Sequence, residues 1–248
     1  MKPTNHINTA EYLTICGLAA VKMICQKQLT AVERLFFDED HAPLFAKACQ
    51  GLARDRKIYR MVKPDELKKI AHTEHHGGAV CVIRSLKPLH HFEGIERAFY
   101  LHDVANSHNI GAIARSLAFF GIAHLFLSPL SYRAAMTASA FRVAEGGLTL
   151  LKLYEVRASS DLFSHCRSNQ ITTVATIKPQ SQKKNTSLTL PSGKVCICLG
   201  NEEDGLDENF IRQCDVAFTL PGSKEIESIN VSAVAAILAS KLAKEVVC

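Results

Sequence analysis

Stretches of helical and strand-like hydrophobic spacing alternate along the first 86 residues. The spacing predicts helices at residues 11–28, 43–52 and 63–71, and strands at residues 33–37, 57–62 and 79–83. In the first helix, Leu13, Cys16, Ala20 and Ile24 recur at helical intervals. Pro64 stands at a first-turn position, where proline is tolerated. This alternation predicts a small three-layer α/β unit.

Apolar runs and helical stretches alternate again from residue 96 onward. The runs predict strands at residues 98–101, 124–127, 153–156, 171–177, 194–199 and 216–220. Helices are predicted at residues 109–120, 161–168 and 207–214 and from residue 230 onward, with a turn region of small residues at 137–147. The continuous apolar run at 194–199 is typical of a strand buried in a parallel sheet. The second unit is therefore predicted to be α/β with a mainly parallel sheet.

Residues 87–95 have no clear periodicity and contain Pro, Gly and paired histidines. Such a segment is typical of a linker between domains. We therefore expect one domain at residues 1–86, a linker at 87–95 and a second domain at 96–248.

Three loops in the second domain leave the ends of predicted strands with glycine and polar residues, near Asn109, Gly200 and Leu220. Ligands of parallel α/β sheets bind at the carboxyl ends of the strands, so these loops are candidates for a binding site. Asn109 is in position to cap a helix, and Gly111 would permit a close approach to its start. Ser228 and Asn230, which follow Leu220, could equally do no more than cap the last helix. None of the three loops carries a dinucleotide or P-loop fingerprint, which argues against a nucleotide-dependent oxidoreductase.

The net charge of +5 is unevenly distributed. Residues 1–90 hold the whole basic excess, whereas residues 91–248 carry equal numbers of basic and acidic side chains. A basic first domain would suit a polyanion such as RNA, although a solvated surface with extra lysines is an equal alternative.

Nine cysteines are spread over the chain without a C-x-x-C pair, and we expect all of them to be reduced, as in the cytoplasm. Cys196 and Cys198 alternate along one strand and should share a buried face. The histidines lack the spacing of a helical zinc site, so we expect no metal; they are His72, His75, His76, His90 and His91. The first twelve residues lack the apolar region of a secretory signal. No apolar run approaches the roughly 20 residues that span a bilayer.

Three motifs follow one another in the second domain. They are N-x-G-A-x-x-R followed by F-G from Asn109, L-G-N-E-x-x-G-L from Leu199, and L-P-G-x(5)-S-I-N-V-S-x-A from Leu220. In this order, each after a strand, they resemble the SpoU (TrmH-like) family of SPOUT RNA methyltransferases over residues 96–248. The first domain resembles the small substrate-binding domain, related in fold to ribosomal protein L30e, that many members carry.

The resemblance implies methylation of a ribose 2′-hydroxyl in tRNA or rRNA, with S-adenosyl-L-methionine as the methyl donor. It implies a deep trefoil knot in the C-terminal α/β domain and a homodimer whose active site lies at the interface. Structured RNA is the expected partner; DNA and membranes are not.

The resemblance also implies site residues. The catalytic candidates are Arg115, Asn109, Glu202, Ser228 and Asn230. The cofactor-binding candidates are Ile177, Leu199, Gly200, Asn201, Gly205, Leu220, Ile229 and Asn230. In the mechanism proposed for the family, the arginine that matches Arg115 acts as a base, which requires an environment that favours its neutral form. A charged Arg115 could instead hold the phosphate beside the target ribose.

Two segments depart from the family pattern. Residues 139–142 read Ser-Ala-Phe-Arg where the family often has S-x-G-A, and they lead to Ala-Glu-Gly-Gly at 144–147. Ile229 replaces the leucine of the third motif and keeps that position apolar. The first departure bears on which nucleotide is the target. An RNA-binding protein that has kept the fold without turnover is the alternative to an enzyme.

Overall fold

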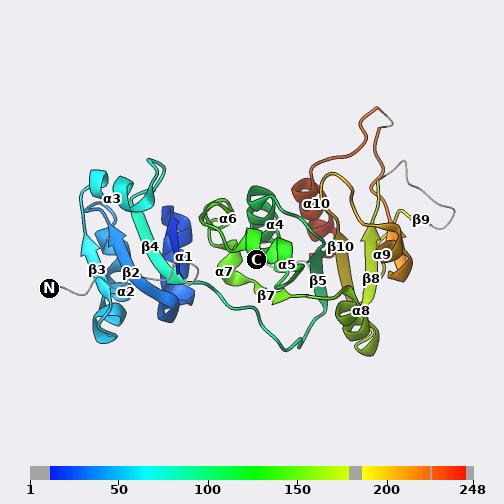
Figure 1. The fold of residues 1–248 in the computed structure, drawn as a ribbon, viewed down its shortest axis with the longest axis horizontal. Helices are drawn as coiled ribbons and strands as arrows, with labels where there is room; N and C mark the ends of the chain where they lie inside the picture. Colours follow the sequence, from blue (N-terminus) through cyan, green and yellow to red (C-terminus); the bar gives the residue numbers. More distant parts are fainter. Residues whose placement is uncertain (1–11, 179–185, 224, 244–248) are drawn as a thin grey trace.

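The computed structural model describes residues 12–178, 186–223 and 225–243, which form two sheets with helices on both faces (Figure 1). The expectation that the first twelve residues hold no secretory signal falls on residues that, except for Tyr12, lie outside the described ones. Lys183 and Lys184, in the predicted polar loop before the strand at 194–199, also lie outside them.

The first unit contains a four-stranded mixed sheet with the order β1-β4-β2-β3. Its elements are β1 (Tyr12–Cys16), α1 (Leu18–Lys27), the 3₁₀ turn η1 (Leu29–Ala31), β2 (Val32–Phe37), α2 (Ala42–Arg54), β3 (Ile58–Met61), α3 (Pro64–Ala71) and β4 (Ala79–Arg84). Strand β4 is antiparallel to β1 and β2, and β3 is parallel to β2. The side chains of α1 and α2 share one buried cluster with Leu35 and Cys81, whereas α3 packs with Phe36 and Val80 on the opposite face. The predicted three layers are therefore present.

The predicted helix at residues 11–28 is wrong in its first part. Residues 12–16 form strand β1, and the helix begins only at Leu18. The segment Tyr-Leu-Thr-Ile-Cys contains β-branched and aromatic residues that favour a strand, and Cys16 pairs with Val80 of β4. Gly17, with φ of 103°, separates strand from helix.

The second unit contains a seven-stranded sheet with the order β7-β6-β5-β10-β8-β11-β9. Its elements are β5 (Arg97–Leu101), α4 (Ser107–Phe119), β6 (His124–Leu127), α5 (Pro129–Ala135), α6 (Ala138–Ala144), α7 (Gly147–Leu150), β7 (Lys152–Glu155), α8 (Ser159–Ser168), β8 (Thr172–Thr176), β9 (Thr186–Ser187), β10 (Val195–Leu199), α9 (Glu208–Gln213), β11 (Val216–Phe218) and α10 (Val231–Leu242). The strand pairs among the described residues of this sheet run parallel. The predicted α/β class with a mainly parallel sheet is confirmed.

Alternate residues of the strands pack against two different groups of helices. Phe99 and Leu101 of β5 share a cluster with α4, α6, α7 and α10, whereas Tyr100 shares another cluster with α8 and α9. Cys196 and Cys198 lie together in the second cluster, as their spacing predicts.

The predicted turn region at residues 137–147 is instead mostly helical. Thr137 caps α6 by accepting a hydrogen bond from the Ala140 amide at 3.2 Å. The small residues serve close packing between helices: a Cβ added to Gly111 of α4 would lie 2.6 Å from the Ala140 carbonyl oxygen. The close approach expected at Gly111 is thus made by α6. The small side chains suggest a turn in the sequence alone because their role depends on this tertiary contact.

The two units touch through α1 and β1 on one side and α6 and α7 on the other (Figure 1). Gln28 donates a side-chain hydrogen bond to the Thr149 carbonyl oxygen at 3.4 Å. The segment between β4 and β5 lies along the second unit, where Phe92 packs edge-on against Phe126 and Tyr154. The two units therefore share a packed boundary in addition to the connecting chain.

The described residues also bear on the expectations for cysteines, metal sites and membrane-spanning helices. Eight cysteines lie in the described ranges, and all are free. Within the same ranges, no group of three or more His, Cys, Asp and Glu side chains is arranged to hold a metal. Among the helices of residues 12–243 that the structure describes, none is long and apolar enough to cross a bilayer.

Candidate functional site

One cavity of about 330 Å³ lies where the loops after β8, β10 and β11 meet. All eight expected cofactor residues line it: Ile177, Leu199, Gly200, Asn201, Gly205, Leu220, Ile229 and Asn230. Glu202 and Ser228, two of the catalytic candidates, line it as well. The cavity volume is in the range of small-molecule and cofactor sites.

Hydrogen bonds hold these three strand ends at one edge of the sheet. Ile177 donates its amide to the Phe218 carbonyl oxygen at 2.9 Å, and Thr219 donates its hydroxyl to the Ile177 carbonyl oxygen at 3.0 Å. Thr176 donates its hydroxyl to the Cys198 carbonyl oxygen at 2.9 Å. The loops therefore start from a rigid edge, as expected for a ligand site at the carboxyl ends of parallel strands.

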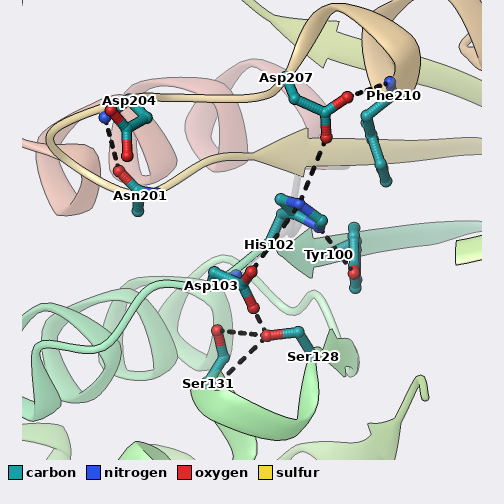
Figure 2. Close-up of polar contacts among 9 residues, drawn as sticks. All are labelled: Tyr100, His102, Asp103, Ser128, Ser131, Asn201, Asp204, Asp207 and Phe210. Atoms are coloured by element: carbon teal, nitrogen blue, oxygen red, sulfur yellow. Dashed lines mark hydrogen bonds and ion pairs between the residues drawn. The ribbon is translucent and has the colours of Figure 1, made fainter. Parts of the chain in front are cut away.

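The loop after β10 is built by its own side chains and glycines. Asn201 accepts hydrogen bonds from the amides of Glu203 at 2.9 Å and Asp204 at 2.7 Å, the second of which Figure 2 shows. A Cβ on Gly200 would lie 2.0 Å from the carbonyl carbon of Gly205, so only glycine fits there. Asn201 thus shapes the cavity wall through its side chain.

Three polar side chains from separate loops form a hydrogen-bonded cluster at the rim. Asn109 donates its side-chain amide to the Glu202 carboxylate and accepts a hydrogen bond from the Asn230 side chain at 3.1 Å. The expectation that Asn109 caps α4 is wrong: Asn106 is the cap, and its side chain accepts from the amides of His108 and Asn109. This leaves the Asn109 side chain available for the cluster.

In the motif that begins at Leu220, Asn230 and Ser228 have different positions and contacts. Asn230 is the N-cap of α10 and accepts from the Ser232 amide at 2.7 Å, so the simple capping interpretation holds for this side chain alongside its place in the cluster. Ser228 lies two residues before the cap and lines the cavity. Ile229 is 49% exposed and presents an apolar side chain at the rim.

Arg115 lies apart from this cluster. It follows Asn109 by six residues on α4, which is about 9 Å along the helix axis and on a different side of the helix. Its guanidinium Nη1 pairs with Glu145 Oε1 at 2.9 Å. The structure therefore brings together Asn109, Glu202 and Asn230 and leaves Arg115 outside their contacts.

Lys178 is a cavity residue that the motifs do not contain. Its ammonium group lies 3.0 Å from the Glu227 carboxylate and donates to the Glu203 carbonyl oxygen at 3.3 Å. It therefore ties together the loops that follow β8, β10 and β11. In the sequence, Lys178 directly follows the predicted strand end at Ile177, and this position is the signal that indicates a site residue.

A second cavity lies at the ends of β5, β6 and β7, next to the loop that follows β10. Figure 2 shows His102 between Asp207 and Tyr100; His102 Nε2 is 3.8 Å from Asp207, and its Nδ1 is 3.1 Å from the Tyr100 hydroxyl. Burial, with nearby anionic groups, raises the pKa of Tyr100 well above its ordinary value, so its hydroxyl stays protonated. The amide of Asp103 donates to Ser128 at 3.1 Å. This network braces the start of α9 against β5.

Two family models match the chain. One, described as the SpoU rRNA Methylase family, matches residues 96–240. The other, described as RNA 2′-O ribose methyltransferase substrate binding, matches residues 14–89.

Two curated relatives are similar to this chain at roughly a quarter identity over the aligned residues. An uncharacterized tRNA/rRNA methyltransferase, YfiF, from Escherichia coli O157:H7 is 26% identical over 235 residues, covering 92% of this chain and 67% of the relative. The 23S rRNA (guanosine-2′-O-)-methyltransferase RlmB from Acinetobacter baylyi is 28% identical over 180 residues, covering 69% and 72%.

Solved structures share the fold across nearly the whole chain. A putative RNA methyltransferase of the TrmH family from Porphyromonas gingivalis has a TM-score of 0.74 at 18% identity, covering 97% of this chain and 98% of that one. The SpoU methyltransferase AviRb from Streptomyces viridochromogenes, in complex with the cofactor AdoMet, has a TM-score of 0.73 at 17% identity, covering 97% and 92%.

Proposed function

The chain belongs to the SpoU rRNA methylase family, and from this membership we propose that it transfers a methyl group from S-adenosyl-L-methionine to a ribose 2′-hydroxyl of RNA. The observation that carries this proposal is the single cavity whose wall contains all eight expected cofactor residues. Its rim carries the cluster of Asn109, Glu202 and Asn230.

The residues of the cavity fit this cofactor. Leu220 and Ile229 offer apolar surface for the adenine ring. A Cβ on Gly222 would meet no atom within 4 Å, so this stretch of wall is open to a ligand. AviRb, which shares the fold, binds AdoMet in its solved complex.

The cofactor supplies an activated methyl group on a sulfonium, and the chain must prepare the acceptor. A ribose hydroxyl is a poor nucleophile until its proton leaves. Asn109, Glu202 and Asn230 are assigned to orient the loops and the acceptor, together with Ser228. Arg115 is assigned to the phosphate beside the target ribose, because a guanidinium binds phosphate in a two-pronged geometry and is normally charged.

The RNA substrate is proposed to be ribosomal rather than transfer RNA. Relatives from several bacteria are described as 23S rRNA methyltransferases, which favours rRNA. The match of residues 14–89 to a substrate-binding family model supports an RNA-binding domain at 1–86, a linker at 87–95 and a catalytic domain at 96–248. The basic excess of the first domain suits this role. The eight free cysteines support a reducing compartment such as the cytoplasm.

The working unit is proposed to be a homodimer. Arg115 points away from its own cluster, so an arginine from a second copy would complete the site. One turn further along α4, Phe119 is 82% exposed, which is unusual for a large apolar side chain. We propose that this side of α4 is covered by the second copy. A trefoil knot around the three loops remains a prediction from the family resemblance.

The proposal is tested with purified protein in two steps. Calorimetric titration of S-adenosyl-L-methionine is expected to give saturable binding of one molecule per protomer. Labelled cofactor is then incubated with rRNA from a strain that lacks this protein, and the expected result is labelled 2′-O-methyl ribose at one position. Cofactor binding without transfer to any RNA, combined with RNA binding, would instead favour the RNA-binding protein without turnover.

A further inference from the structure

A two-residue turn, Glu145 and Gly146, joins α6 to α7 and lies against both units of the chain. A Cβ added to Gly147 would lie 2.8 Å from the Cα of Arg115, and one added to Gly146 would lie 2.6 Å from the Cβ of Met23 in α1. Neither position has room for a side chain. The turn is therefore fixed between α4 and the first unit, and its first residue, Glu145, is fixed with it.

Glu145 occupies a backbone conformation that glycine usually takes. It is the C-cap of α6 in the left-handed region, with φ of 47°, and Gly146 follows with φ of 94°. A side chain in this region is uncommon, and such strain tends to persist where the side chain has a use. The position carries a carboxylate where the fold alone would accept glycine.

The use of that carboxylate is its contact with Arg115. Glu145 Oε1 lies 2.9 Å from Arg115 Nη1, and the two side chains are 49% and 58% exposed. An ion pair as exposed as this one adds little to stability. It does, however, fix the direction of a long side chain that would otherwise sample many rotamers.

We propose that Glu145 is a positioning residue for Arg115: its fixed carboxylate holds the guanidinium in the orientation that meets the phosphate of the bound RNA. This inference rests on the proposed function. Orienting a group before the substrate binds removes part of the cost of ordering it in the transition state. The segment Ala-Glu-Gly-Gly at 144–147, to which the departure from the family pattern at residues 139–142 leads, thereby acquires a role in the site.

The test compares Glu145→Ala and Glu145→Gln with Glu208→Ala. The control removes the carboxylate of the Glu208–Arg212 pair, which has the same 2.9 Å separation and is similarly exposed. Glu145→Ala is expected to lower kcat on the order of tenfold. KM for RNA should not rise, because losing a carboxylate also removes repulsion of RNA phosphates. Glu145→Gln should keep more of the activity, since its amide oxygen still accepts from Arg115.

A second readout does not depend on turnover. The side-chain ¹⁵N resonances of Arg115 are measured by NMR in the full chain and assigned with Arg115→Lys. Slow exchange of the guanidinium protons is expected in the wild type and in Glu208→Ala, and faster exchange in Glu145→Ala. Unchanged exchange, or an unchanged kcat in Glu145→Ala, overturns the positioning role. A wild type that transfers no methyl group contradicts the proposed function instead, and the NMR result still decides whether Glu145 orders Arg115.

Discussion

Asn230 donates a side-chain hydrogen bond to Asn109 at 3.1 Å, although 121 positions separate the two residues. The same Asn230 side chain accepts from the Ser232 amide and caps α10. Asn109 in turn donates its side-chain amide to the Glu202 carboxylate. These side chains therefore join the beginnings of α4 and α10 to the loop after β10. Removing the Asn230 side chain and removing the Asn109 side chain should have different consequences.

Substitution of Asn230 by alanine should affect both stability and activity, whereas Asn109→Ala should affect activity alone. Loss of a helix cap costs about 1 kcal/mol, and Asn109 caps no helix. Urea denaturation measures the first effect and methyl transfer the second. Equal losses of stability in the two variants would contradict the division of roles.

Gly200→Ala should abolish binding of S-adenosyl-L-methionine and destabilise the fold. The added Cβ would overlap the backbone of Gly205, and overpacking of this kind costs about 1 to 3 kcal/mol. Gly222→Ala is the matched control for stability, because its Cβ would meet nothing within 4 Å. Calorimetry measures cofactor binding and thermal melting measures stability for both variants. Normal cofactor binding by the Gly200→Ala protein would contradict the proposal that Gly200 forms part of the cofactor site.

Phe119→Asp should convert the dimer into a monomer. A carboxylate placed on the side of α4 assigned to the interface would have to be desolvated there. Leu44→Asp, at another exposed apolar side chain in α2, should leave the oligomer unchanged. Light scattering during size-exclusion chromatography distinguishes the two. A wild type that elutes as a monomer at all concentrations would end the dimer proposal.

Two inactive variants should restore activity when their protomers are mixed. If Arg115 of one copy serves the Asn109–Glu202–Asn230 cluster of the other, a heterodimer of Arg115→Ala and Asn109→Ala has one intact site. Random exchange should then recover roughly a quarter of the wild-type activity. Methyl transfer is measured after the variants are exchanged under mild denaturation. No recovery, with heterodimers demonstrated by tagged protomers, would place the whole site within one copy.

The stability of the fold should fall as the pH is lowered through about 6.5. Burial, assisted by the charge of Lys152, lowers the pKa of His124, whose Nδ1 is 3.1 Å from the Tyr154 hydroxyl. The folded state then binds fewer protons than the unfolded state, so acid favours unfolding below the ordinary histidine pKa. Melting temperatures at pH 7.5 and 5.5 should differ less in His124→Gln than in the wild type. If the two proteins show the same difference in melting temperature, groups other than His124 cause the loss of stability.

The cofactor wall could be predicted from the sequence, whereas the surroundings of Arg115 could not. Gly200, Leu220 and Asn230 stand in motifs that follow strand ends, so local spacing carries their placement. Glu145 follows a run of small residues that packs against Gly111, and it precedes Gly146, which packs against Met23. Such contacts between distant segments leave no periodic signal.

The strand at residues 12–16 and the cap at Asn106 cannot be predicted from local spacing, for related reasons. Apolar residues at 13 and 16 fit both a helix and a strand, and only pairing with β4 decides between them. Two asparagines, at 106 and 109, both stand near the start of α4. The helix begins at Ser107, so Asn106 is the cap, and Asn109, inside the first turn, is left to contact Glu202.

The separation of Asn109 from its two partners sets an order of events during synthesis. Glu202 and Asn230 follow it by 93 and 121 residues. At about 5 to 20 residues per second, the ribosome needs roughly 6 to 24 s to add the longer stretch. Until then the Asn109 side chain lacks both of these partners, and contacts between such distant segments form late in folding. A newly made chain would thus lack the complete cluster of Asn109, Glu202 and Asn230 until this late pairing is made.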